Sequence, residues 1–257
     1  MIVTLNGYVA ADDDQWLYDY FGLSAFSPGI VRQAIAGTSE GEDLIVEINS
    51  GGGSVFAGFE IYSALRSAAC RTVAHVQSLA ASAASTIMCG CTEVLLSPVA
   101  QVMLHLPSLC TDGNRQAHRD SIRMLDSITQ SILNGYELRC AGHTSRGELE
   151  RLMTRETWIP AQEAVSMGLA DGLLYQDEAD GGALSAAVVN AVGGGIRALS
   201  FTAVPGPDAL RANYEALVRA GAAPAPGHPV APGETPVKIR DHWRAEARLR
   251  IEKSRFI

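Results

Sequence analysis

The chain has 257 residues, of which 47% are hydrophobic and 19% charged, a balance that excludes a disordered or fibrous protein. It carries 20 Lys and Arg against 28 Asp and Glu, a formal net charge of −8, so the phosphate backbone of a nucleic acid is not expected as its main partner. The length allows one large domain with a buried core, or one domain with an appendage.

No targeting segment and no membrane span are predicted. The first residues, MIVTLNGYVAADDD, lack the basic stretch of a secretory signal, and the longest weakly polar stretch, 72–88, contains His75, Gln77 and several serines. The five cysteines are scattered, and their odd number favours reduced thiols over a disulfide framework. We therefore expect a cytoplasmic protein.

Residues 1–177 alternate between strand and helix patterns. In chain order the sequence predicts strand Ile2–Val9, helix Pro28–Ala36 with Ser27 as N-cap, strand Leu44–Ile48, loop Asn49–Gly53, helix Ala57–Ala68, strand Thr72–Val76, helix Ala80–Cys89, strands Val94–Leu96 and Val102–His105, and helices Arg115–Ala141, Ser145–Met153 and Ala161–Met167. This alternation predicts an α/β domain with a largely parallel sheet.

The composition changes near residue 178. Seven of the eleven prolines lie between 205 and 236, so 178–236 is predicted to be a Gly/Ala/Pro-rich, extended and partly disordered linker. Residues 237–257 form a basic tail whose apolar residues recur at helical spacing. For this tail, a solvated helix is favoured over binding to an acidic partner.

Three segments have residue types suited to chemistry. The first, INSGGGSV, places Gly51, Gly52 and Gly53 between a predicted strand and a helix, where backbone N–H groups can approach a ligand closely. A flexible turn or a simple anion-binding helix start would produce the same pattern. A nucleotide P-loop is excluded because no Gly-Lys-Ser/Thr follows.

The other two segments contain a serine and a histidine. In SLAASAAS, Ser82 stands at the start of a predicted helix, where the helix dipole and the next N–H group can assist a nucleophile. Taken alone, such a run of small residues is more typical of close helix packing. In VMLHLP, His105 ends an apolar run. A histidine in this position can be a general base or a core residue. Ser85 is a rival nucleophile, but one turn further into the helix it is expected to pack.

Two further clusters favour structural roles. The run Asp12–Asp14 lies near a predicted helix start, which is typical of solvated caps rather than of a cation site. Cys89 and Cys91 lack a second pair of ligands and are expected to be buried packing residues. The sequence predicts no metal site and no cofactor.

Four motifs together resemble the Clp protease proteolytic subunit (ClpP) family. INSGGGSVFAG is similar to the family's INSPGGSV-type loop, SLAASAAS to its GQAASMG-type nucleophile turn, and VMLHLP to its VMIHQP-type histidine strand. EAVSMGLAD is similar to its EAVEYGLVD-type closing helix. The resemblance covers about residues 1–176 and implies a ClpP/crotonase-like fold of repeated β-β-α units with a protruding handle helix, here Arg115–Ala141.

The resemblance also implies roles for individual residues. Ser82 would be the nucleophile and His105 the general base, while the family's third residue, an Asp, falls on Glu156. A carboxylate one methylene longer can still orient an imidazole. The N–H groups of Gly53 and Ala83 would form the oxyanion hole. Gly51 replaces the proline of the family's loop.

The implied assembly is a homo-oligomeric ring, a heptamer or a stacked pair of heptamers. The chain begins almost directly at the first strand, without the segment through which housekeeping Clp subunits contact their ATPase, and this weakens the expectation of an AAA+ unfoldase partner. Together with the C-terminal extension, it favours the phage and prophage ClpP-related branch assigned to head maturation, acting in the cytoplasm or at the prohead.

The leading hypothesis is therefore a serine endopeptidase that cleaves polypeptides without a cofactor and is not associated with membranes. A ring-forming assembly or scaffold protein with a degenerate triad is the alternative, motivated by Glu156 and Gly51. Acyl-CoA chemistry on a crotonase-like fold is a third hypothesis, which the Ser and His motifs disfavour.

Overall fold

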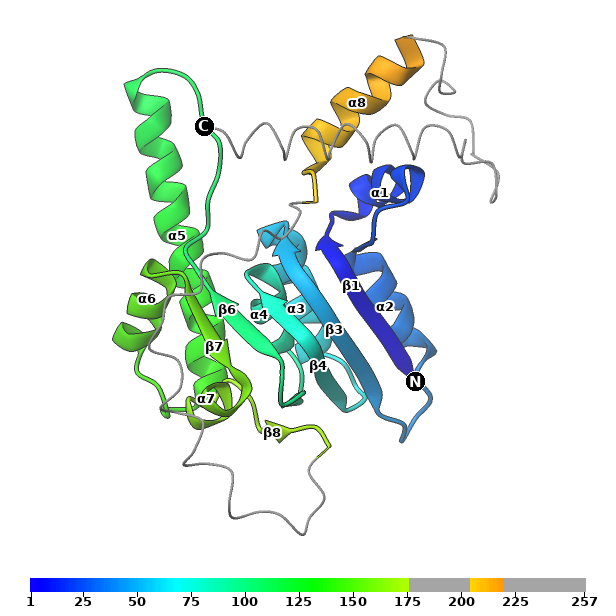
Figure 1. Ribbon diagram of the computed structural model, residues 1–257, viewed down its shortest axis with the longest axis vertical. Helices are drawn as coiled ribbons and strands as arrows, with labels where there is room; N and C mark the ends of the chain where they lie inside the picture. The colour runs from blue at the N-terminus through cyan, green and yellow to red at the C-terminus, as the bar shows by residue number, and fades with distance from the viewer. Residues whose placement is uncertain (176–203, 220–257) are drawn as a thin grey trace. The chain divides into compact units, whose positions relative to one another are not determined.

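The computed structural model describes residues 1–175 and 204–219, which belong to two compact units (Figure 1). The larger unit contains residues 1–12 and 25–175, and the smaller contains 13–24 and 204–219. The predicted basic tail 237–257 and most of the predicted linker lie outside the described residues. Within the described ranges, no helix has the length and apolar character needed to cross a membrane.

The larger unit is built on an eight-stranded sheet. Its strands are β1 (Ile2–Val9), β2 (Ala25–Phe26), β3 (Leu44–Gly53), β4 (Thr72–Ala81), β5 (Glu93–Leu96), β6 (Gln101–Leu104), β7 (Thr157–Pro160) and β8 (Gly172–Leu173). The order is β2-β1-β3-β4-β5-β8, with β6 beside the end of β4 and β7 beside β6. All pairs are parallel except β6 with β7. The mixed α/β fold predicted for the family is confirmed.

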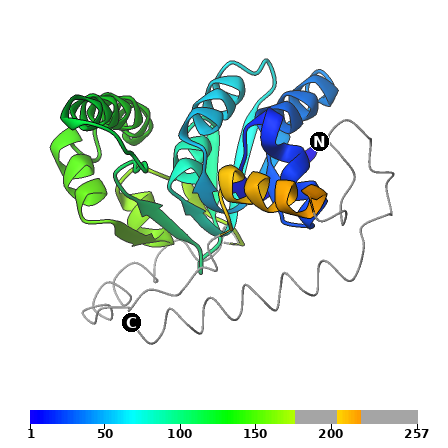
Figure 2. The same cartoon turned by 90° about the horizontal axis from the view of Figure 1, so that it is seen from above.

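Helices connect the strands of this sheet and pack against them. They are α2 (Pro28–Gly37), α3 (Val55–Arg66), α4 (Ala83–Met88), α5 (Arg115–Cys140), α6 (Arg146–Thr154) and α7 (Ala161–Ser166). Figures 1 and 2 show α2, α3 and α4 behind β1, β3 and β4. Alternate residues of β3, Leu44, Val46 and Ile48, are fully buried, as the two-residue period of a strand requires.

Two predicted boundaries are wrong, and for the same reason. The segment Asn49–Gly53 was expected to be a loop, yet β3 continues through it because Gly52 and Gly53 pair with the end of β1. The helix expected from Ala80 begins only at Ala83, because Leu79–Ala81 extend β4 and pair with β6. Glycine and alanine give no strand signal in the sequence, but neighbouring strands supply partners for their backbone groups.

The long helix α5 protrudes from the body of the larger unit, as the predicted handle does (Figure 1). Asn114 caps its first turn, accepting hydrogen bonds from the N–H groups of Gln116 and Ala117. Its buried residues begin only at Ile128, so the first three turns project beyond the core.

The smaller unit pairs α1 (Gln15–Phe21) with α8 (Pro207–Arg219). The Tyr214 ring packs edge-on against Trp16 and Tyr20, with centroids 5.0 and 5.1 Å apart. The extended linker predicted for 178–236 is therefore wrong over α8. Proline is favoured at a helix start, and Leu210 and Tyr214, one turn apart, give the helix a buried face.

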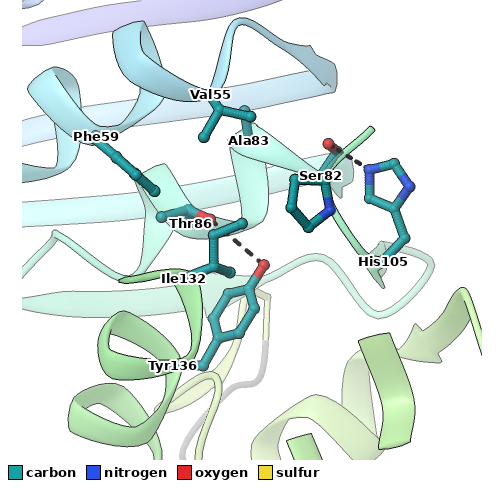
Figure 3. Close-up of a pocket in the computed structure, with 9 residues that line it drawn as sticks. Val55, Phe59, Ser82, Ala83, Thr86, His105, Ile132 and Tyr136 are labelled. Atoms are coloured by element: carbon teal, nitrogen blue, oxygen red, sulfur yellow. Dashed lines mark hydrogen bonds between the residues drawn. The ribbon is translucent and has the colours of Figure 1, made fainter. Parts of the chain in front are cut away.

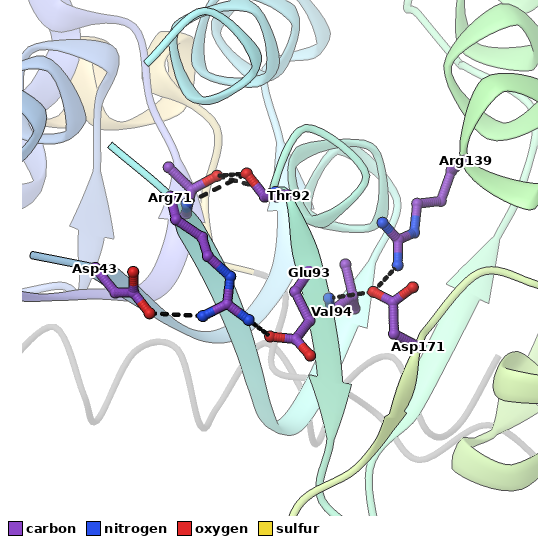
Figure 4. Close-up of polar contacts among 8 residues, drawn as sticks. Asp43, Arg71, Thr92, Glu93, Val94, Arg139 and Asp171 are labelled. Atoms are coloured by element: carbon purple, nitrogen blue, oxygen red, sulfur yellow. Dashed lines mark hydrogen bonds and ion pairs between the residues drawn. The ribbon is translucent and has the colours of Figure 1, made fainter. Parts of the chain in front are cut away.

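The carboxylate of Asp171 holds the segment that leads into β8. Asp171 accepts the Val94 N–H at 2.7 Å and forms an ion pair with Arg139, whose side chain is only 9% exposed (Figure 4). Asp171 thereby joins β5 to the end of α5. Next to it, Arg71 at the start of β4 forms ion pairs with Asp43 at the start of β3 and with Glu93 at the start of β5.

We predict that Asp171→Ala lowers the free energy of unfolding by about 1–2 kcal/mol, since it removes a charged acceptor and leaves a buried guanidinium unpaired. Urea denaturation at fixed protein concentration measures this. As the matched control, Asp120→Ala, which loses the exposed pair with Arg123, should cost less than about 0.5 kcal/mol. Equal losses in the two variants would contradict the structural role of Asp171.

Candidate active site

Ser82 occupies a strained turn between β4 and α4. Its backbone angles, φ 55° and ψ −125°, lie in a region that non-glycine residues rarely adopt. The turn is held because the Ser82 N–H donates to the Met103 carbonyl at 3.0 Å and the Ser82 carbonyl accepts the Ser85 N–H at 3.0 Å. Strain that the surrounding structure enforces in this way is typical of functional positions.

His105 lies beside Ser82. Its Nε2 atom is 2.7 Å from the Ser82 Oγ, although the two residues are 23 positions apart (Figure 3). The contact follows from the sheet: β4 and β6 run parallel with Ala81 opposite Met103, so the chain leaves both strands at the same edge. Burial lowers the pKa of His105, and the charge of Glu156 acts against this effect. A neutral imidazole can accept the Ser82 hydroxyl proton at Nε2.

Glu156 lies near His105 without a hydrogen bond to it. It immediately precedes β7, which pairs antiparallel with β6 and sets Thr157 opposite Leu104. One further step of this register places Glu156 opposite His105. The Glu156 side chain is exposed, and no hydrogen bond joins it to the imidazole within the described part of the chain. The structure thus brings together all three residues of the predicted triad, but joins only two of them directly.

The glycine run lies directly against the nucleophile turn. Gly52 has φ 95°, and a Cβ atom there would lie 2.7 Å from the Ser82 Cβ and 3.0 Å from the Ala83 nitrogen. Only glycine permits this approach. Gly53 instead approaches β1, where an added Cβ would lie 2.5 Å from the Val9 carbonyl oxygen. The resemblance to the family implied a role for Gly53 but not the contact of Gly52 with the Ser82 turn, for which the run of three glycines was the only sequence signal.

The N–H group of Ala83 stands in the first turn of α4, where N–H groups have no partner within their own helix. Ser82 is the N-cap residue, yet its side chain does not cap the helix because the hydroxyl faces His105. Among the described residues no backbone acceptor is found for the Ala83 N–H, so this group can bind an external acceptor next to the nucleophile.

A small pocket that is open to solvent adjoins Ser82 and His105 (Figure 3). Its remaining walls are mainly apolar and consist of Val55, Phe59, Ala83, Thr86, Pro107, Ile132 and Tyr136. Ser85 is absent from this lining. It is fully buried and hydrogen-bonded to Tyr136, so the prediction that it packs rather than faces a substrate is confirmed.

The remaining candidate residues have structural surroundings. Cys89 and Cys91 are buried in the core, which raises the pKa of both thiols, that of Cys91 to about 12. Asp12 accepts the Gly29 N–H at 2.7 Å and pairs with Arg32, so it caps α2 in place of the Ser27 side chain. Burial alone would raise the pKa of Asp12, but these contacts lower it. Across the described ranges, no three His, Cys, Asp or Glu side chains are grouped to hold a metal ion.

Comparison with known proteins supports an assignment to a family. The Clp protease family model matches residues 29–177, more than half of the chain. The chain is 31% identical over 141 residues to the ATP-dependent Clp protease proteolytic subunit 1 of Chlamydia muridarum, covering 54% of this chain and 73% of that protein.

Proteolytic subunits from other bacteria are also similar. Subunit 2 of Corynebacterium diphtheriae is 30% identical over 136 residues, which is 51% of this chain and 66% of that protein. The proteolytic subunit of Porphyromonas gingivalis is 26% identical over 141 residues, 53% of this chain and 62% of that protein. The matched region includes the serine turn, the histidine strand and the glycine run, and the chain belongs to the Clp protease family.

Proposed function

We propose that this protein is a serine endopeptidase in which Ser82 is the nucleophile and His105 the general base. The observation that carries the proposal is the 2.7 Å contact between Ser82 Oγ and His105 Nε2 at a strained strand-to-helix turn. Membership of the Clp protease family agrees with peptide-bond hydrolysis.

The proposed reaction passes through an acyl-enzyme. The Ser82 oxygen attacks the carbonyl carbon of the scissile bond while its proton passes to His105 Nε2. His105 then gives that proton to the departing amine as the C–N bond breaks, leaving an ester on Ser82. A water molecule, deprotonated by His105, hydrolyses the ester and restores the serine hydroxyl. No cofactor is required by these steps.

Glu156 and two N–H groups would support this chemistry. With Nε2 facing Ser82, the proton of the neutral imidazole lies on Nδ1. A carboxylate opposite His105 can accept a hydrogen bond from this Nδ1–H group and stabilise the imidazolium. We propose Glu156 for this role, after a side-chain movement that closes the hydrogen bond. The N–H groups of Gly53 and Ala83 are the proposed oxyanion donors. Ala83 directly follows Ser82 in the first turn of α4, and Gly53 directly follows Gly52, which packs against the Ser82 turn.

The pocket favours a substrate with an apolar side chain next to the cleaved bond. Val55, Phe59 and Ile132 line it within reach of Ser82, and they offer dispersion contacts rather than charge. Polypeptide segments in extended form are the proposed substrates. Phage capsid or scaffold proteins are the proposed natural substrates. The proposed place of action is the cytoplasm or the prohead.

We further propose a homo-oligomeric ring. Support comes from the projecting half of α5, where the apolar side chains of Ile122 and Met124 are 58% and 46% exposed and could be covered by a second copy. A ring-forming scaffold protein with a degenerate triad is the second candidate function, and the missing hydrogen bond between Glu156 and His105 favours it.

Labelling with a fluorophosphonate separates these two functions. We expect the probe to modify the wild type at Ser82, and Ser82→Ala to abolish labelling and to lower peptide hydrolysis by at least about 10³-fold. Ser63→Ala, on the exposed face of α3, is the matched control and should label normally. An unlabelled wild-type oligomer would support the scaffold.

The pH profile tests His105. Because burial lowers the pKa of His105, kcat/KM should rise with pH through a midpoint below about 6.5, as the imidazole loses its proton and becomes a base. Glu156→Gln removes a charge that stabilises the imidazolium, so the midpoint should move to lower pH and the plateau should fall. A midpoint that moves upward would contradict the proposed interaction.

Gly52→Ala tests the close approach of the glycine run. The new Cβ would displace the Ser82 turn, and we expect about 10²-fold slower labelling, the effect of a misplacement of roughly 1 Å. Gly51→Ala is the control, since Gly51 has open space around it and no positive φ. Similar rates for the two variants would show that the contact between Gly52 and Ser82 does not matter.

A further inference from the structure

A chain of three buried hydroxyl groups ends at the backbone of Ser82. Ser85 Oγ lies 2.6 Å from the Ser82 carbonyl oxygen and 2.7 Å from the hydroxyl of Tyr136. Thr86 Oγ1 lies 3.4 Å from the same Tyr136 hydroxyl (Figure 3). All three side chains are at most 5% exposed.

The direction of each hydrogen bond follows from the groups involved. A carbonyl oxygen can only accept, so the single proton of Ser85 goes to Ser82. Tyr136 must therefore donate its proton to Ser85, and Thr86 donates to Tyr136. Burial raises the pKa of Tyr136, which keeps its hydroxyl neutral and able to donate. The chain thus runs in one direction, from Thr86 through Tyr136 and Ser85 to the Ser82 carbonyl.

The carbonyl at the end of this chain belongs to the peptide that carries the Ala83 N–H. A peptide unit is planar and trans, so its C=O and N–H groups point in opposite directions and turn together. A hydrogen bond that fixes the Ser82 carbonyl therefore also fixes the direction of the Ala83 N–H. Aligned hydrogen bonds also polarise one another, which makes that N–H a stronger donor.

A serine that bonds to the carbonyl three residues earlier is common in helices and alone would carry no inference. Here a second element takes part. Tyr136 comes from α5, and its hydroxyl reaches across to α4 in a position where burial without a partner would be costly.

We propose that Tyr136 and Ser85 are positioning residues that orient the Ser82–Ala83 peptide so that its N–H faces the developing oxyanion. The inference rests on the proposed serine peptidase function. It also links the projecting helix α5, which carries Tyr136, to the geometry of the nucleophile turn.

Steady-state hydrolysis of a fluorogenic peptide with an apolar residue at the cleaved bond tests the proposal. Tyr136→Phe and Ser85→Ala should each lower kcat by about 5- to 10-fold, the worth of one buried hydrogen bond, with KM nearly unchanged. The double variant should be no slower than the slower single variant, because both changes break the same chain. The His105 limb of the pH profile should not move.

Thr129→Val is the matched control, since it removes a buried hydroxyl from α5 whose only partner among the described residues is the Leu125 carbonyl within the same helix. It should leave kcat and KM as in the wild type. Fluorophosphonate labelling and thermal unfolding are measured for every variant, and kcat is calculated per labelled site. If Tyr136→Phe does not fold, the values of kcat for Ser85→Ala and Thr86→Val test the proposal in its place.

Two results would overturn the inference alone: an active wild type with kcat within twofold in both single variants, or losses that multiply in the double variant. A rise in the KM of Tyr136→Phe without a fall in its kcat would also overturn the inference, because it would show that Tyr136 acts only as part of the pocket lining. A wild type that neither labels nor hydrolyses peptide would instead overturn the proposed function, and this inference with it.

Discussion

The parallel pairing of β4 with β6 is the constraint on which the site depends. Because Ala81 lies opposite Met103, Ser82, one position beyond this pair, and His105, two positions beyond it, emerge at the same edge of the sheet within hydrogen-bond distance. The antiparallel β7 then places Glu156 on the other side of His105. A slip of one residue between β4 and β6 would turn these side chains to opposite faces and separate them.

The turn at Ser82 is held from several directions. The glycine run packs against its side chain, the Met103 carbonyl accepts its N–H, and the hydroxyl chain from Tyr136 ends at its carbonyl. Such contacts compensate for an unfavourable φ, and they bring groups from β3, β6 and α5 to one turn. Asp171 joins β5 to the end of α5, and this bond limits how far α5 can move relative to the sheet.

Much of this arrangement could be predicted from the sequence. Apolar alternation located β1 and the start of β3, and helical spacing located α3 and α5. The three short motifs marked Ser82, His105 and the glycines as candidates, and the resemblance of these motifs to the Clp protease family implied their roles. The ends of β3 and β4 were missed, since glycine and alanine gain strand structure only from neighbouring strands. The Ser85–Tyr136 contact was beyond prediction, because it joins residues 51 positions apart on two helices. The helix α8 was missed because nearby prolines outweighed its Leu210–Tyr214 spacing.

The central claim is that Ser82 attacks a carbonyl whose oxygen then meets two backbone N–H groups. A high-resolution structure of the protein after reaction with a fluorophosphonate measures this most directly. The account predicts a covalent bond from Ser82 Oγ to phosphorus, with the phosphonyl oxygen about 2.7–3.1 Å from the nitrogens of Gly53 and Ala83. An unmodified Ser82, or a phosphonyl oxygen pointing away from both nitrogens, would contradict it.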